Sequence, residues 1–264
     1  MLNISIIIVS FNGRAHLERC LQSLHDAPPS RSHEIIVVDN SSTDGSTDVA
    51  RRWPAVRLIE NVANLGFAAG NNVGIRASSG EYLLLLNSDT IVPAGAVDAL
   101  AAALDRDPSI AIVGPRLVNM EGRAELSVGR MVGPWNELRQ KYLMPAHAEQ
   151  LARQEQFADW VSGACLLVRR ADAEAVGGLD ERYFMYLEDV DFCAAIRARG
   201  RRVLFTPDVE VTHLRGGSRA SVSAATERAY RQSQLAFYEK HHPSWVPLLR
   251  LYQRLYHHHR SADS

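Results

Sequence analysis

Cysteine is scarce in this sequence. Its 264 residues include three cysteines, Cys20, Cys165 and Cys193, which lie far apart and form no C-x-x-C pair. Disulfide-stapled domains and zinc knuckles need closely spaced cysteines. The spacing therefore excludes both classes of protein and is typical of a reducing compartment.

The sequence also lacks an excess of positive or negative charge, and it lacks long apolar runs. The formal net charge is -1 at pH 7, so no overall basic field favours nucleic acid as a partner. No stretch reaches the ~18 apolar residues that a membrane-spanning helix needs. The N-terminus, MLNISIIIVSF, lacks a basic region and a small-residue cleavage site, which indicates a first strand and not a signal peptide. We therefore expect a cytoplasmic protein, either free or at the inner face of the cell membrane.

The first 115 residues alternate between apolar runs and helical patterns. The runs are residues 5–9, 35–38, 82–86 and 110–113, and an amphipathic stripe follows the first at Leu17, Cys20, Leu21 and Leu24. A second helix is predicted to begin near residues 42–48. Strands that are apolar on both faces belong to parallel sheets covered by helices. We predict an α/β fold with a Rossmann-like, mostly parallel sheet, helices on both faces and further helices at the C-terminus.

The pattern is irregular over residues 115–160, as in many binding loops. Regular elements resume after this stretch, and the last part of the chain is expected to be helical. They are, in order, a strand at 163–169, a helix at 188–199 ended by Gly200, two short strands at 202–206 and 209–213 joined by a turn at Pro207 and Asp208, and a mobile segment at 214–221.

Polar side chains stand where two of the predicted strands end. Asp39 ends the strand at 34–39, where a carboxylate can accept a hydrogen bond from the imide N–H of uracil or thymine. Asp89 follows Asn87 and Ser88 after the most apolar strand, where it suits a hard cation that bridges diphosphate oxygens. Ligands bind beyond the carboxyl ends of parallel strands, which favours both roles. A turn-forming or helix-capping acid is the alternative for each.

Small residues fill the loop at 64–72, NLGFAAGNN, which enters a predicted helix. Small side chains let the backbone approach a ligand, and helix N-termini attract phosphate. The loop is not G-x-G-x-x-G and does not follow the first strand, so a dinucleotide site is poorly supported. A simple tight turn is an equally good interpretation.

Three acids crowd the start of the helix predicted at 188–199: Glu188, Asp189 and Asp191. Part of this charge compensates the helix dipole. Helical periodicity puts Asp189 on the apolar face of the helix and Asp191 on a face of alanines. An inward carboxylate at the border of a cleft can be tuned for proton transfer by partial desolvation, so we predict Asp189 as the reactive group.

Two further features keep alternatives open. His213 ends the last predicted strand, where a lone histidine is either structural or a metal ligand. The segment 244–258 carries an apolar stripe that consists of Trp245, Leu248, Leu249, Tyr252, Leu255 and Tyr256. Such a stripe can dock on the protein's own core, dock on a second subunit in a homodimer, or lie as a basic amphipathic helix on anionic lipid.

Six short segments, in this order, resemble the family-2 glycosyltransferases of the GT-A fold. The similarity is to the branch of bacterial rhamnosyl- and galactofuranosyltransferases and covers roughly residues 3–240. The segments are SIIIVSFN (5–12), IVVDNSS (36–42), NLGF (64–67), LNSDT (86–90), VSGA (161–164) and EDVD (188–191). Each is modest alone, but the ordered set is highly specific.

The resemblance implies a nucleotide-sugar donor site at the strand ends. Asp39 would bind the base, surrounded by the backbone of Val9, Ser10 and Phe11. Further donor contacts would come from Asn64, Gly66 and Phe67 in the small-residue loop and from Asn87, Ser88 and Asp89 at the family's D-x-D position. Asp89 and His213 would be the ligands of Mg²⁺ or Mn²⁺, and Asn87 stands where the motif has its first acid.

The resemblance also implies roles in the second half of the chain. Asp189 matches the catalytic base, and Trp160, Gly163 and Glu188 fall in the acceptor pocket. Arg215 and Arg219 in the segment predicted to be mobile are candidates to neutralise the diphosphate in place of a metal. The Q-x-x-R-W motif of processive members is absent, which implies one sugar per encounter.

These implications define the expected organisation and activity. A catalytic domain would span 1–222, with a nucleotide-binding half (1–115) and an acceptor-binding half (116–222), followed by a helical extension (223–264). It would transfer a sugar such as rhamnose, with inversion, from a dTDP- or UDP-linked donor to a hydroxyl of a glycan or lipid-linked acceptor in cell-surface polysaccharide synthesis.

Three rival classes of protein fit the sequence less well. A non-catalytic protein that binds nucleotide sugars or carbohydrate would not need the full set of acids. A nucleotidyltransferase would need a longer basic loop after the first strand than residues 10–14 provide. A Rossmann oxidoreductase would need the glycine fingerprint that is missing.

Overall fold

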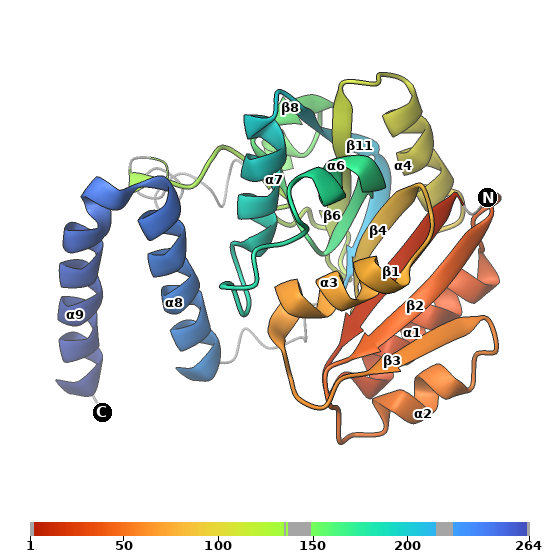
Figure 1. Ribbon diagram of the computed structural model, residues 1–264, viewed down its shortest axis with the longest axis horizontal. Coiled ribbons are helices and arrows are strands. Elements are labelled where there is room, and N and C mark those ends of the chain that lie inside the picture. The colour runs from red at the N-terminus through yellow and green to blue at the C-terminus, as the bar shows by residue number, and fades with distance from the viewer. Residues whose placement is uncertain (1–2, 135, 137–148, 215–223, 263–264) are drawn as a thin grey trace.

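A computed structural model of the protein describes residues 3–134, 136, 149–214 and 224–262 (Figure 1). Nine strands of these residues form one sheet, in which eight follow the order β3-β2-β1-β4-β10-β6-β11-β5 and β8 pairs with β11. The strands are β1 (Ile4–Ser10), β2 (His33–Asp39), β3 (Val56–Glu60), β4 (Tyr82–Asn87), β5 (Thr90–Ile91), β6 (Ile110–Val118), β8 (Gln156–Ala158), β10 (Cys165–Arg169) and β11 (Arg202–His213). A separate small sheet pairs β7 (Val128–Gly129) with β9 (Trp160–Val161).

The N-terminal half of the sheet is parallel. β1 lies between β2 and β4, and β3 extends the sheet beyond β2. Alternate residues of β1 face two separate cores, with Ile4, Ile6 and Ile8 on one side and Ile7 on the other. Successive side chains of a strand point to opposite faces, so a strand covered on both sides must be apolar throughout. The predicted α/β architecture with a mostly parallel sheet is confirmed.

The second half of the sheet mixes directions. β10 is antiparallel to both β4 and β6, whereas β11 is parallel to β6. The prediction of two strands between residues 202 and 213 was wrong, because this segment forms the single strand β11. Its pairing with β6 shifts register between Thr206 and Glu210. Pro207 has no N–H to give to the ladder, and the irregularity accommodates it without ending the strand.

Helices cover both faces of the sheet (Figure 1). The core on one face contains residues of α1 (Arg14–Asp26), α2 (Ser46–Arg51) and α4 (Ala96–Asp105), and the core on the other contains residues of α3 (Gly66–Ala77), α6 (Arg170–Ala175) and α7 (Glu188–Ala198). The predicted stripe of Leu17, Cys20, Leu21 and Leu24 is the buried face of α1.

The C-terminal helices project from the sheet as a hairpin. It consists of α8 (Ala224–His241), the short 3₁₀ helix η1 (Pro243–Trp245) and α9 (Val246–Ala262), with α9 farthest from the sheet (Figure 1). Phe237 and Tyr238 of α8 are buried in the same core as α7. Among the described residues, no helix is long and apolar enough to cross a membrane.

Candidate active site

Strand register brings the predicted donor residues to one edge of the sheet. Ser10 pairs with Asp39 across β1 and β2, and Val9 pairs with Asn87 across β1 and β4. These strands are parallel, so their carboxyl ends meet at this edge, where α/β proteins bind ligands. We call it the donor edge.

Asp39 presents one unused carboxylate oxygen at the donor edge. Its Oδ2 accepts a hydrogen bond from the backbone N–H of Ser42 at 2.7 Å. Its Oδ1 is buried and has no hydrogen-bond partner within the described residues, and the same holds for the hydroxyl of Ser10. Phe11, which directly follows β1, is half-exposed. An unsatisfied buried acceptor costs free energy. These two oxygens therefore mark a position where a bound ligand could place a hydrogen-bond donor.

The small-residue loop packs against the donor edge as a tight turn. Gly66 has a φ of 83°, and a Cβ on it would lie 2.3 Å from the carbonyl oxygen of Phe184, so only glycine fits. Asn64 accepts a hydrogen bond from the N–H of Gly66 at 2.9 Å. Phe67 donates its N–H to Phe184 at 2.7 Å. Asn40, after β2, donates its side-chain amide to the carbonyl of Gly66 at 3.0 Å and thereby fixes the loop beside Asp39.

A histidine stands between two carboxylates next to Asn87. The Nε2 of His213 lies 3.2 Å from Asp89 Oδ1 and 3.4 Å from the Nδ2 of Asn87. The Nδ1 of His213 lies 2.9 Å from Glu125 Oε2. Ser88 and Asp89 form the turn between β4 and β5. The pairing of β11 with β5 carries His213 from the far end of the chain to this turn.

The charges of this cluster stabilise one another. Burial lowers the pKa of His213, but its hydrogen bonds to Asp89 and Glu125 outweigh burial and raise the pKa to about 9. Burial likewise opposes ionisation of Asp89, yet the hydrogen bond and charge of His213 hold its pKa below the usual range. Without a metal, the cluster therefore holds an imidazolium at neutral pH.

Two groups of the cluster have the chemistry of metal ligands. In the part of the chain that the structure describes, no group of three or more His, Cys, Asp or Glu side chains is arranged to hold a metal ion. Asp89 and the Nε2 of His213 could supply two ligands, while Glu125 fixes the ring through Nδ1. Mg²⁺ commonly binds one or two protein groups and completes its coordination with substrate phosphates and water. The residues fit a cation held jointly with a diphosphate.

Asp189 lies in the first turn of α7, half-buried against Gly163. Its Oδ2 accepts the N–H of Gly163 and its Oδ1 the N–H of Val190, both at 2.8 Å. Burial raises the pKa of Asp189, and the two N–H groups oppose that shift. Burial and the charge of Asp189 raise the pKa of the neighbouring Glu188 well above its usual range. Within the described residues, Oε2 of Glu188 has no hydrogen-bond partner.

The segment before β10 connects Asp189 to the donor edge. β10 runs opposite to β4 and pairs Cys165 with Leu86, so its start lies where β4 ends. The N–H of Asn87 donates to the carbonyl of Ala164 at 2.9 Å. A Cβ on Gly163 would lie 3.1 Å from the Cβ of Asp189, so glycine permits the close approach of α7. Asp189 and the Asp89 turn therefore flank one short segment.

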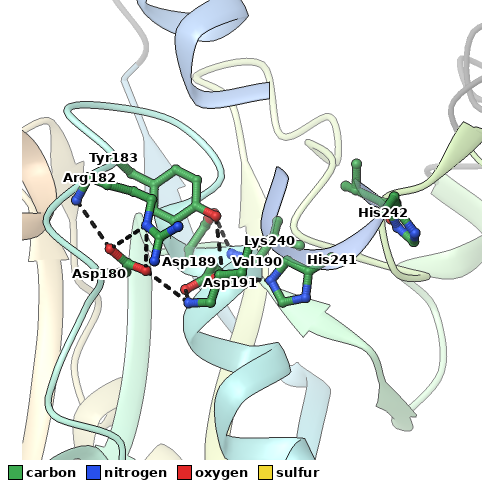
Figure 2. A network of polar contacts seen from close by, with 10 residues as sticks. Asp180, Arg182, Tyr183, Asp189, Val190, Asp191, Lys240, His241 and His242 are labelled. Atoms are coloured by element: carbon green, nitrogen blue, oxygen red, sulfur yellow. Dashed lines mark hydrogen bonds and ion pairs between the residues drawn. The ribbon is translucent and has the colours of Figure 1, made fainter. Parts of the chain in front are cut away.

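Asp191 is buried in a polar network, with 2% of its surface exposed (Figure 2). Its carboxylate accepts hydrogen bonds from Lys240 Nζ at 2.8 Å and from the hydroxyl of Tyr183 at 3.3 Å, and lies 2.6 Å from His241 Nε2. Lys240 also donates to Asp180 at 2.9 Å. Helical periodicity predicted only the face of α7 that carries Asp189 to point inward. This prediction was wrong for Asp191, because α8 covers the face that carries it. Asp191 anchors the C-terminal hairpin to α7.

Comparison with known proteins shows what kind of protein carries this site. Residues 5–177 match the family model Glycosyl transferase family 2. The chain belongs to this family. It is 32% identical to the N-acetylglucosaminyl-diphospho-decaprenol L-rhamnosyltransferase of Mycobacterium tuberculosis, over 91% of this chain and 85% of that protein. It is 24% identical to the rhamnosyltransferase WbbL of Escherichia coli, over 79% of this chain and 82% of that protein.

Solved structures agree on the fold of this glycosyltransferase. The mannosyltransferase PcManGT of Pyrobaculum calidifontis, determined in complex with GDP-Man and Mn²⁺, superposes with a TM-score of 0.65 at 20% identity, over 94% of this chain and 68% of that one. GalNAc-T7, determined with UDP, GalNAc and Mn²⁺, gives 0.64 at 17% identity, over 89% of this chain and 49% of that one. The GT-A fold expected from the sequence is confirmed.

Other predicted site residues of the glycosyltransferase differ in their surroundings. Trp160 is buried, and its indole N–H donates to the carbonyl of Arg130 at 2.8 Å. Its ring lies against Gly129, where a Cβ would come within 2.7 Å of it. The polar group of Trp160 is therefore satisfied inside the protein, in contrast to Oε2 of Glu188. Arg215 and Arg219 lie outside the described residues.

Sequence reasoning missed several groups that hold the site of this glycosyltransferase together. Glu125 contacts His213 from 88 residues away, and Lys240 and His241 contact Asp191 from 49 and 50 residues away. No local pattern marks these partners, since each depends on segments that only the tertiary fold brings together. Asn40 is different, because its position directly after Asp39 at a strand end was a usable signal.

Proposed function

We propose that this glycosyltransferase moves rhamnose, or a related hexose, from a dTDP- or UDP-linked donor to a hydroxyl of a lipid-linked glycan, with inversion. The names of two relatives support the sugar, and the M. tuberculosis relative is named for an N-acetylglucosaminyl-diphospho-decaprenol acceptor. A further relative is named as the O-antigen biosynthesis protein RfbC of Myxococcus xanthus, which supports a role in cell-surface polysaccharide synthesis.

The observation that carries the proposal is that three chemically different groups lie at the donor edge or on the α7 turn beside it. They are the unused acceptor oxygen of Asp39, the Asp89 and His213 pair, and the carboxylate of Asp189. A sugar nucleotide needs three matching partners, one for its base, one for its diphosphate and one for the hydroxyl that attacks its sugar. This correspondence favours an enzyme over a protein that only binds sugar.

Asp39 selects the base by hydrogen-bond chemistry. An ionised carboxylate oxygen is an acceptor only, and the imide N–H of uracil or thymine is a matching donor. At the same ring position cytosine has the acceptor N3, which cannot donate to Oδ1 of Asp39. The geometry therefore supports uridine or thymidine diphosphate donors over cytidine donors.

Asp89 and His213 would hold Mg²⁺ or Mn²⁺ beside the diphosphate. Such a cation, when bound, neutralises the charge that develops on the departing nucleoside diphosphate. Asp89 is already ionised, whereas His213 must release the proton on Nε2 to become a ligand. Glu125 keeps the ring oriented through Nδ1 during this change.

Asp189 accepts the proton of the attacking hydroxyl. Each of its oxygens receives one N–H hydrogen bond, which leaves lone pairs for the acceptor. Its raised pKa makes it a stronger base than an exposed aspartate. One direct displacement inverts the anomeric centre, so the reaction needs no second carboxylate as a nucleophile. Glu188, with its raised pKa, can donate a hydrogen bond that orients the acceptor.

The test is a transfer assay in which each sugar nucleotide is supplied separately, together with a defined acceptor. Purified protein is incubated with dTDP-rhamnose or UDP-hexoses and a prenyl-diphosphate-linked N-acetylglucosamine, and the product's anomeric configuration is determined by NMR. We expect transfer from one of these donors with inversion. A product with retained configuration would overturn the mechanism, and donor binding without release of nucleoside diphosphate would support a non-catalytic binding protein.

A further inference from the structure

The outer side of α9 exposes an apolar stripe. Leu248, Leu251, Tyr252 and Leu255 follow the spacing i, i+3, i+4 and i+7 of one helix face, and they are 56%, 53%, 50% and 56% exposed. Another face of α9 is buried in the core through Val246 and Leu249. The stripe expected from the sequence is thus divided, since Leu249 docks on protein while most of the described remainder faces outward. Contiguous exposed apolar residues of this kind mark interaction surfaces.

The same helix is basic. α9 contains three arginines and three histidines and no acidic residue. A groove of about 310 Å³ between α8 and α9 is lined by Arg228, Arg231, Arg250 and Arg254. Arg231 and Arg250 form ion pairs with glutamates. Arg228 and Arg254 form no ion pair with another residue that the structure describes, so their charge is available to an anion.

We propose that α9 lies on the surface of an anionic phospholipid bilayer. The stripe of Leu248, Leu251, Tyr252 and Leu255 would enter the interface, and the arginines of the groove would meet lipid phosphates. The basic charge of α9 favours this partner over a second copy of the chain. The groove that the arginines line lies between α8 and α9, so contact between two copies through the stripe would leave Arg228 and Arg254 without an anionic partner. A bilayer that carries anionic lipid complements both features.

The position of α9 gives this contact a consequence for the site. α8 lies between α9 and the sheet (Figure 1), and Lys240 and His241 join α8 to Asp191 on α7 (Figure 2). Ser233 of α8 also donates to the carbonyl of Met185, just before α7. A hairpin held on the bilayer would therefore fix the first turn of α7, with Asp189, at a set position relative to a membrane that carries the acceptor. This consequence rests on the proposed function, but the membrane contact does not.

The membrane contact is tested by co-sedimentation of the full chain with phosphatidylcholine vesicles that contain about one third phosphatidylglycerol. Leu248→Ser with Leu255→Ser should weaken binding at least about tenfold, because both side chains enter the interface. The matched control is Val62→Ser with Met120→Ser, which removes two exposed apolar side chains elsewhere and should leave binding unchanged. Equal binding by the two double variants would overturn the proposal.

The charge contribution is tested by Arg228→Glu with Arg254→Glu. Binding to the anionic vesicles should fall several-fold, and raised salt should reduce wild-type binding more than it reduces binding of the variant. Arg19→Glu, on the exposed side of α1, is the control and should bind as the wild type does. Wild-type binding that is equal for neutral and anionic vesicles would contradict the role of the arginines.

The oligomeric state distinguishes the second copy from the bilayer. Light scattering without lipid should give the same mass for the wild type and for the Leu248→Ser, Leu255→Ser variant. A dimer that this variant converts to a monomer, without a change in vesicle binding, would overturn the proposal and assign the stripe to a subunit interface. Neither measurement uses donor or acceptor, so failure here is distinguishable from failure of the proposed transfer reaction.

Discussion

The donor edge and the Asp189 side of the site are built in different ways. At the donor edge, Asp39 and Asn87 stand where neighbouring parallel strands end, and backbone pairing with β1 sets their positions. On the other side, Asp189 lies on a helix whose first turn depends on Gly163 and on the C-terminal hairpin. A side chain at a strand end can therefore change with little effect on the fold. On the Asp189 side, the proposed base depends on long-range packing, and the predictions below test this difference.

The largest effect is expected at Asp189. Asp189→Asn keeps the shape of the side chain but removes the base, so transfer should fall by about 10²–10⁴-fold while donor affinity stays within a few fold. Single-turnover kinetics and calorimetric titration with nucleoside diphosphate measure the two quantities.

Asp191→Asn is the matched control for Asp189. Its carboxylate is engaged by Lys240 and His241, so the change should lower stability more than it lowers the rate of a folded sample. If Asp191→Asn abolished turnover while Asp189→Asn retained it, the assignment of the base to Asp189 would be reversed.

The second prediction concerns removal of the divalent cation, which should stop transfer. We expect a chelator to abolish activity and Mn²⁺ or Mg²⁺ to restore it, and Asp89→Ala to weaken Mn²⁺ binding measured by electron paramagnetic resonance in the presence of nucleoside diphosphate. Glu125→Gln should weaken Mn²⁺ binding less, because it acts only through the orientation of His213. Full activity in chelator would instead make Arg215 and Arg219 the groups to test for charge neutralisation.

Asp39→Ala should weaken donor binding at least about tenfold, the effect of losing one buried charge-assisted hydrogen bond. The turnover number at saturating donor should change little, since the proposed contact of Asp39 is with the base and not with the reacting sugar. Titration with uridine and thymidine diphosphates gives the affinity. Unchanged affinity for both nucleotides would remove Asp39 from the donor site.

Lys240→Met should lower the free energy of unfolding by about 1–3 kcal/mol, because it removes one of the partners of the buried Asp191 carboxylate. The control Arg250→Gln breaks a pair of half-exposed side chains with Glu239 and should change stability by less than about 1 kcal/mol. Denaturant titration compares the two variants. Equal effects would show that the network in Figure 2 is no more important than a surface ion pair.

The smallest effect concerns pH. The pKa of His213 rises from 6.5 to about 9 on folding, so its contribution to stability is complete below pH 6.5 and is lost as pH rises through 9. In chelator, the difference in melting temperature between wild type and His213→Gln should therefore shrink between pH 6.5 and 9.5, by several degrees. A difference that stays constant over this range would contradict the ion pairs of His213.

Much of the donor edge could be predicted from sequence because its information is local. Apolar runs followed at once by Asp39 or by Asn87 and Asp89 predict both a buried strand and the candidate site residues at its end. The irregular stretch at 115–160 gave no such pattern, which is why Glu125 was missed. Pro207 misled the prediction for the opposite reason, since a strong local signal for a turn was accommodated inside the continuous strand β11.

By itself, the sequence determined the alternating elements, the acids and small residues at their ends, and membership of a glycosyltransferase family. Those features follow from hydrophobic periodicity and from chemistry at single positions, which a chain carries before it folds. Only the tertiary structure decided which oxygen of Asp39 is unpaired, that Glu125 orients His213, and that α8 buries Asp191. Each of these depends on groups brought together from distant parts of the chain, and packing and desolvation act on such groups only after they meet.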